Sequence, residues 1–332
     1  MEGSMATTHP PTIPILGPLQ PGTTQRHLVT LPGAALADEA RPVTTITGAK
    51  PGPVLFVGAG VHGGEYPAVE TVIRLGTSLD AAEVAGTVVL MPVLNLPAFW
   101  QRSMFVCPVD NVNPNRVFPG DPNGTYSEQM THAFTNDFIA HADAYIDLHG
   151  GDIPEALVPF SICRAGTTAT DAKAKELATV FGLPYLLAVS RPIQPAKGSS
   201  SYVAAAERGV PGFIAEAGGV GQLQQDAVEL LVTGVRRVLA HLGMSEEKIA
   251  DVPAPILLTG FEWVYAKNAG IFYPAVGVDE VVHAGQAIGK VGSLFGEMLE
   301  TIIAPVSGRV LFLTINPAIQ ANGLLMGLGV TE

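Results

Sequence analysis

Between residues 51 and 243, short apolar runs alternate with amphipathic segments of helical period. This alternation restricts the chain to a small set of folds. We expect strands at 54–58, 87–94, 144–148, 158–163, 185–189 and 212–216, and helices at 65–78, 127–141, 171–180, 200–208 and 224–242. Strands that alternate with helices predict an α/β fold in which helices cover both faces of a sheet.

Two segments flank this region. Residues 1–50 are rich in Pro, Thr and Gly, and we expect an extended arm or edge strands there. Beyond 245–255 only short apolar runs broken by Gly and Pro remain, which is typical of a small all-β module. The predicted organisation is an N-terminal segment (1–50), an α/β domain (51–250) and a C-terminal β module (255–332).

Composition excludes several classes of partner. The chain has 18 basic and 30 acidic residues, a net charge of −12, which is unlike proteins that bind nucleic acid or an anionic membrane surface. No apolar run approaches the length of a membrane span, and the start lacks the pattern of a secretory signal. The two cysteines, Cys107 and Cys163, form no CxxC, so we expect reduced thiols and a cytoplasmic location.

The segment LFVGAGVHGGE, residues 55–65, ends a predicted strand and opens a predicted helix. Its isolated GxGxxG is a weak signal for dinucleotide binding, because Asp80 follows the helix and does not close a second strand. The same segment carries His62 and Glu65, and this HxxE spacing at a strand-to-helix turn can aim both side chains at one point.

His149 and Glu216 close two further predicted strands. In open α/β sheets, sites lie outside the carboxyl ends of the strands. Two histidines and one glutamate with an open coordination position form a catalytic zinc set, so His62, Glu65 and His149 are candidate ligands. Glu216 ends an otherwise apolar strand and needs a polar partner there, such as a water on the metal.

The loop at 110–120 contains Asn115 and Arg116. The planar guanidinium of arginine matches a carboxylate in a bidentate way, so this pair is a candidate clamp for a substrate carboxylate.

Four motifs, GxHGxE, DxxNxNRxFPG, DLHGGD and EAGG, occur in this order and together resemble the succinylglutamate desuccinylase/aspartoacylase family. That family is a branch of the zinc carboxypeptidase-like hydrolases, and the resemblance runs from about 51 to 332. It implies a mixed sheet with helices on both faces and a small C-terminal β module. It also implies one zinc ion on His62, Glu65 and His149, with Glu216 as general acid/base and Asn115 and Arg116 on the substrate's carboxylate. Family members usually carry an upstream arginine that polarises the scissile carbonyl, and Arg102 is the candidate.

The expected function is zinc-dependent hydrolysis of the amide bond in a small, carboxylate-bearing N-acyl amino acid or related N-acyl compound. The rivals are a metallocarboxypeptidase acting on peptides, a nonhydrolytic binding protein that keeps the fold, and a dinucleotide-dependent oxidoreductase. The C-terminal module is expected to pack against the α/β domain or to cover its active site. The sequence leaves open the acyl group, the amino acid, the oligomeric state (a homo-oligomer included), and which of Tyr202, Tyr265 and Tyr273 contacts the substrate.

Overall fold

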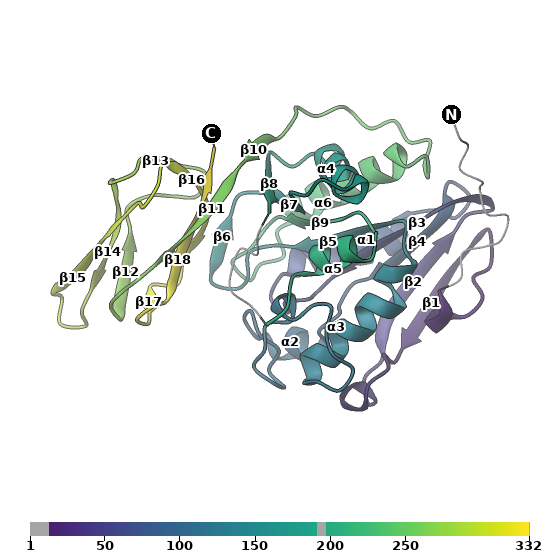
Figure 1. Ribbon diagram of the computed structural model, residues 1–332, viewed down its shortest axis with the longest axis horizontal. Helices are drawn as coiled ribbons and strands as arrows, with labels where there is room; N and C mark the ends of the chain where they lie inside the picture. Colours follow the sequence, from purple (N-terminus) through teal and green to yellow (C-terminus); the bar gives the residue numbers. More distant parts are fainter. Residues whose placement is uncertain (1–12, 191–196, 332) are drawn as a thin grey trace.

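The computed structural model describes residues 13–190 and 197–331. The first 12 residues of the predicted N-terminal segment therefore lie outside the described part of the chain. An α/β part built on a nine-stranded sheet is followed by a smaller part made of two β-sheets, which lies at the left of Figure 1.

The large sheet has the order β1-β2-β4-β3-β5-β9-β7-β8-β10. Its strands are β1 (Thr23–Val29), β2 (Arg41–Thr47), β3 (Lys50–Ala59), β4 (Ala85–Met91), β5 (Ala144–His149), β7 (Phe160–Arg164), β8 (Tyr185–Val189), β9 (Gly212–Glu216) and β10 (Ile256–Leu258). The central strands β4, β3, β5 and β9 are parallel, whereas β1–β2, β2–β4 and β7–β9 pair antiparallel. The sheet is therefore mixed. Of the strands within residues 1–50, β1 lies at its edge, whereas β2 is paired on both sides, with β1 and β4.

Helices cover both faces of this sheet, as predicted. They are α1 (Tyr66–Ser78), α2 (Leu96–Gln101), α3 (Tyr126–Asp137), α4 (Ala169–Phe181), α5 (Ser201–Glu207) and α6 (Gln225–His241), with short 3-10 helices η1 (Pro14–Leu16), η2 (Ala34–Leu36), η3 (Pro114–Arg116) and η4 (Ile139–His141). The apolar sides of α1, α4 and α6 share one core with the sheet, and those of α3 and α5 share another on the opposite face. The sequence did not predict α2.

Helix α3 begins at Tyr126, one residue before the predicted 127–141 helix, and ends at Asp137. Its cap is Thr125, whose side chain accepts from the Glu128 amide while the Glu128 side chain accepts from the Thr125 amide. Ser127 lies inside the first turn, where Asp110 accepts hydrogen bonds from its amide at 2.7 Å and from its hydroxyl at 3.0 Å. A capping box satisfies two helix-end amides at once, which a single serine cap cannot do.

The C-terminal part consists of one five-stranded and one four-stranded sheet around a separate apolar core. Its strands are β6 (Glu155–Leu157), β11 (Gly260–Tyr265), β12 (Gly270–Pro274), β13 (Val281–Val282), β14 (Ala287–Gly292), β15 (Met298–Ile303), β16 (Gly308–Thr314), β17 (Ala318–Ile319) and β18 (Leu324–Val330). Two of the strands cross the predicted boundary between the α/β domain and the β module. Strand β6 lies in the α/β region of the sequence but pairs with β16, whereas β10 lies after that region but pairs with β8 of the large sheet. Within the described residues, none of the helices is long and apolar enough to cross a membrane.

Candidate active site

The loop between β3 and α1 carries His62 and Glu65 and depends on glycine. Gly60 has a φ of 66°, a conformation that L side chains rarely adopt. At Gly63 a Cβ would lie 2.2 Å from the carbonyl carbon of Ala98, so α2 packs directly on the loop. Backbone conformation at Gly60 and close packing at Gly63 thus account for two of the three glycines of the GxGxxG pattern. Glu65 follows as the residue that precedes α1.

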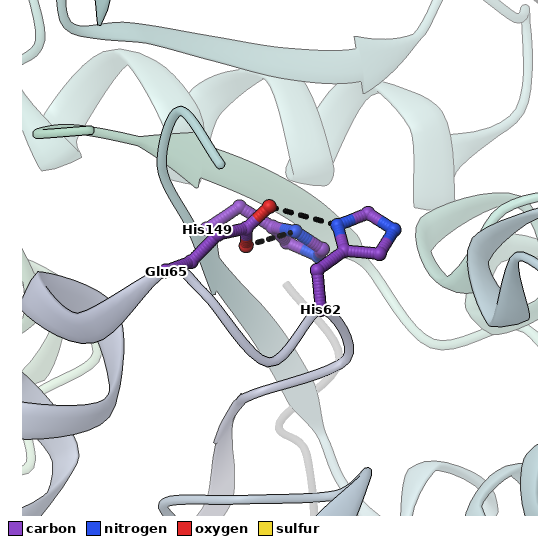
Figure 2. A group of neighbouring side chains, drawn as sticks. All are labelled: His62, Glu65 and His149. Carbon is purple, nitrogen blue, oxygen red and sulfur yellow. Dashed lines mark hydrogen bonds and ion pairs between the residues drawn. The ribbon is translucent and has the colours of Figure 1, made fainter. Parts of the chain in front are cut away.

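Three side chains from this loop and from β5 converge. The Nδ1 atom of His62 lies 2.8 Å from Glu65 Oε1, and the Nδ1 atom of His149 lies 2.9 Å from Glu65 Oε2. Figure 2 shows the Glu65 carboxylate between the two imidazoles, with each oxygen facing one ring. The ring centroids of the two histidines are 5.2 Å apart. The predicted set of His62, Glu65 and His149 is therefore brought together by the fold.

The outward nitrogen of each imidazole faces an oxygen acceptor. Asn113 Oδ1 lies 3.1 Å from Nε2 of His62, and Asp147 Oδ2 lies 3.0 Å from Nε2 of His149. When Nε2 carries the proton and donates to these oxygens, the lone pair of Nδ1 is free and points into the site. The sequence analysis missed both acceptors. Asp147 lies two residues before His149 on one strand, where alternate side chains share a face, and this spacing was available as a signal.

The three side chains of the cluster strongly shift one another's pKa values. Burial opposes ionisation of Glu65, but His149 and His62 outweigh it and hold the pKa of that carboxyl at about 2. Burial likewise opposes protonation of His149, and the carboxylates of Asp147 and Glu65 outweigh burial and raise the pKa of the imidazole well above its usual value. Two buried carboxylates thus attract positive charge to this point. A metal cation at the same place would supply the positive charge that protons on the imidazoles supply in its absence.

The donor atoms of His62, Glu65 and His149 fit a metal ion. One ligand atom from each residue lies within 4.8 Å of the others. Glu65 Oε2 is buried and forms no hydrogen bond of acceptable geometry, although His149 Nδ1 is close to it. Two imidazoles and one carboxylate are ligands that zinc and related divalent ions accept.

Glu216 lies beside this cluster. Strands β5 and β9 are parallel neighbours with His149 opposite Glu216, so both side chains emerge at the carboxyl edge of the sheet. Glu216 lines the same cavity as the three candidate ligands. Burial raises the pKa of its carboxyl well above the usual value, and His149 opposes this rise. A carboxyl group poised to take up a proton is therefore adjacent to the candidate metal site.

Asn115 and Arg116 also line the cavity. They belong to η3, and Asn115 is 5% exposed. The side chain of Asn115 accepts a hydrogen bond of 3.0 Å from the amide of Ser201, at the start of α5. The backbone carbonyl of Asn115 accepts one of 2.8 Å from Arg116 Nη1. These contacts fix the turn that presents the arginine to the cavity. The fold thus brings together every predicted site residue except Arg102.

Arg102 is not brought to the site. It follows α2 with a φ of 53°, its side chain is exposed, and it is absent from the described residues that line the cavity. This placement gives no support to a role at the scissile carbonyl. Of the three tyrosines left open by the sequence, Tyr202 lines the cavity, whereas Tyr265 and Tyr273 do not.

The cavity has a volume of about 310 Å³ and lies between the two parts of the molecule. Phe261, Trp263, Phe312 and Leu324 of the C-terminal part contribute to its lining. The sequence analysis missed these residues individually, but it expected the module to pack against or cover the site. It also missed Glu155 on β6, a lining residue whose pKa is raised to about 7 by burial and by the nearby carboxylates.

Comparison with known proteins identifies this arrangement. Residues 51–242 match the family model of the succinylglutamate desuccinylase/aspartoacylase catalytic domain. The chain is 28% identical over 274 residues to the N-alpha-acetyl-L-2,4-diaminobutyric acid deacetylase of Halomonas elongata, covering 81% of this chain and 77% of that protein.

Solved structures show the same fold over nearly the whole chain. The product-bound ectoine utilization protein EutE (DoeB) of Ruegeria pomeroyi superposes with a TM-score of 0.84 at 24% identity, covering 95% of this chain and 97% of that one. A succinylglutamate desuccinylase/aspartoacylase from Rhodobacter sphaeroides gives 0.82 at 24% identity, over 94% and 96%. The match of the catalytic-domain model to more than half of the residues settles the assignment: this chain belongs to the succinylglutamate desuccinylase/aspartoacylase family.

Proposed function

We propose that the protein is a zinc-dependent deacylase that hydrolyses the amide bond of a small N-acyl amino acid bearing a free carboxylate. The observation that carries this proposal is the convergence of His62 Nδ1 and His149 Nδ1 on the two oxygens of Glu65, with Glu216 and Arg116 on the same cavity. A zinc ion held by these three ligands supplies Lewis acidity to the amide carbonyl and to the attacking water.

Glu216 is the proposed general acid/base. It lies opposite His149 on the neighbouring strand and is not part of the three-ligand set. Its carboxylate would accept the proton of the attacking water and return it to the nitrogen of the departing amine. Three protein ligands leave a coordination position for solvent and substrate, which a fourth protein ligand would fill.

Arg116 is the proposed anchor for the substrate carboxylate. Its guanidinium lines the cavity, and its turn is held by Asn115 and by the start of α5. With the carboxylate fixed there, the amide would be held between Arg116 and the ligand cluster. Such positioning lowers the entropic part of the barrier. The deacetylase of Halomonas elongata removes an acetyl group from an N-acylated amino acid, and this similarity supports an amide of the same kind as substrate.

A hydrolysis screen tests the proposal. Zinc-loaded protein is incubated with a panel of N-acyl amino acids and, in parallel, with dipeptides, and the released amine is quantified. We expect release from the N-acyl amino acids, its loss on chelation and its recovery on addition of zinc. Preferential release from dipeptides would indicate a carboxypeptidase instead. A protein that binds zinc at full occupancy and hydrolyses neither group would be a binding protein that keeps the fold.

A further inference from the structure

The cavity extends beyond the proposed catalytic groups into a region lined mainly by apolar side chains, here called the apolar compartment. Its walls are Leu157, Phe160, Ile162, Ile214, Phe261, Trp263, Phe312 and Leu324, together with Tyr202. Neither the carboxylate clamp nor the proposed acid/base uses these side chains. The proposed chemistry therefore leaves these nine of the twenty lining residues without a role.

Strand register places the floor of the compartment next to Glu216. Strands β7 and β9 pair antiparallel, with Phe160 opposite Glu216 and Ile162 opposite Ile214. Paired residues share a face, and so do residues two apart on one strand, so these four side chains form one continuous surface. The floor thus begins at the proposed acid/base and continues for about 7 Å along the sheet, the rise of two residues.

The C-terminal part supplies the opposite wall. Phe261 and Trp263 alternate along β11, and Phe312 on β16 pairs with Leu157 on β6. The rings of Phe261 and Trp263 have centroids 4.8 Å apart, and those of Trp263 and Phe312 are 5.4 Å apart. The three rings support one another, so the wall is a preformed aromatic surface.

Most of the compartment's lining is apolar. Burial raises the pKa of Tyr202, and burial is also the largest cause of the raised pKa of Glu155, which lines the same cavity. An apolar group of a substrate would therefore gain from burial here.

We propose that the apolar compartment selects N-acyl amino acids that carry a bulky aliphatic or aromatic group. The inference rests on the proposed function and narrows its substrate class. An acetylated small amino acid would occupy Arg116 and the ligand cluster but leave the aromatic wall uncovered. The group that fills the compartment comes either from the acyl chain or from the amino-acid side chain. Leu157 on β6 and Leu324 on β18, which lies between the two strands that carry the aromatic rings, act as specificity-determining residues.

Kinetics with zinc-loaded protein distinguish the two sources. N-acetylalanine is the reference, N-hexanoylalanine and N-benzoylalanine form the acyl arm, and N-acetylleucine and N-acetylphenylalanine form the side-chain arm. Each buried methylene is worth up to about fourfold in kcat/KM. We expect at least one arm to exceed the reference by ~10-fold or more. Values for both arms within about twofold of the reference would overturn the inference.

Three matched leucine variants locate the effect. Leu157→Ala and Leu324→Ala should each lower the ratio of kcat/KM for the preferred bulky substrate to that for N-acetylalanine by about fivefold. Leu299→Ala is the control, because Leu299 lies on β15 of the C-terminal part, is 42% exposed and does not line the cavity. This control should leave the ratio unchanged, and zinc content verifies that all variants are folded. Unchanged ratios in both wall variants would overturn the assignment.

A binding measurement separates this inference from the proposed function. Titration calorimetry with Glu216→Gln protein compares N-acetylalanine with the bulky substrates in the absence of turnover. We expect a bulky substrate to bind ~10-fold more tightly, with a negative heat-capacity change from apolar burial. Tight binding of a bulky substrate with no hydrolysis by the wild-type protein would overturn the proposed function but support the preference for bulky apolar groups. Hydrolysis with no binding preference would overturn that preference and leave the proposed function intact.

Discussion

Asp147 and His149 lie two residues apart on β5, and Asp147 Oδ2 is 3.0 Å from Nε2 of His149. Asp147 is fully buried and accepts a hydrogen bond from the hydroxyl of Ser201. Its contact with His149 is electrostatic, because Nε2 forms no hydrogen bond of acceptable geometry. The carboxylate lies behind the imidazole and favours a proton on Nε2, while Nδ1 faces Glu65. A histidine held in this way is a stronger and better-aligned metal ligand.

Asp147→Asn should weaken zinc binding by ~10- to 100-fold, because the amide keeps the size of the side chain but loses its charge. A chelator competition measures the affinity. Asp80→Asn is the control, because Asp80 is an exposed residue after α1 whose side chain accepts from the Ala82 amide. An unchanged zinc affinity for Asp147→Asn would show that the carboxylate does not act through His149.

Replacing His62, Glu65 or His149 by Ala should remove metal and activity together, because each supplies one of the three donor atoms that converge. Metal content after purification and amine release are measured on the same preparation. His132→Ala should keep both, because His132 lies on α3 and contacts Asn136 rather than the cluster. Full metal occupancy in His149→Ala would refute the ligand assignment.

Arg116→Lys should lower kcat/KM by at least ~10-fold, or about 1.4 kcal/mol, because lysine keeps the charge but loses the bidentate fork. The loss should be confined to substrates with a free carboxylate and should be much smaller for their C-terminal amides. Arg74→Lys is the control, because Arg74 lies on α1, away from the cavity, and forms ion pairs with Glu70 and Glu229. Equal losses for both kinds of substrate would contradict the clamp.

Glu216→Gln should keep metal and fold but lose kcat by ~100-fold or more, because the amide cannot accept a proton. KM should change less, since Arg116 carries the positioning of the substrate. The acidic limb of the pH–rate profile should weaken in whatever activity remains. Near wild-type kcat, or loss of zinc from this variant, would return Glu216 to a structural role.

Glu155 should make the metal-free protein less stable as the pH rises. Burial raises the pKa of this carboxyl from 4.5 to about 7, so between these values the folded state holds a proton that the unfolded state has released. Stability then falls as the pH rises from about 4.5 through 7, by on the order of 3 kcal/mol at most.

The amide side chain in Glu155→Gln does not titrate, so this variant lacks the proton that Glu155 holds in the folded wild-type protein. The melting temperatures of variant and wild type should agree near pH 4.5 and diverge in favour of the variant by pH 8. Calorimetry on chelator-treated protein measures both. A constant difference across this range would show that Glu155 ionises normally in the folded state.

The catalytic half of the site could be predicted from the sequence because its residues end strands. His149 and Glu216 each close an apolar run, and His62 and Glu65 follow another, so a single rule about strand ends brings them together. Arg102 ends no predicted strand, and its assignment depended on the family resemblance alone. It follows α2, a helix that the sequence did not predict, so its position could not be anticipated.

The substrate half could not be predicted in the same way. Phe261, Trp263 and Phe312 reach the cavity only because the C-terminal sheets lie against the α/β part. Likewise, the apolar run at 256–265 is divided between β10 and β11, which belong to different sheets. Long-range strand pairing decides which sheet a strand joins, and a local pattern of hydrophobicity carries no information about that pairing.

The exchange of strands between the two parts has a mechanical consequence. Strand β6 leaves the α/β region to pair with β16, whereas β10, directly before β11, pairs with β8 and stays in the large sheet. A hinge that swung the aromatic wall outward would have to break the β6–β16 ladder. We therefore expect the mouth of the cavity to keep a fixed width.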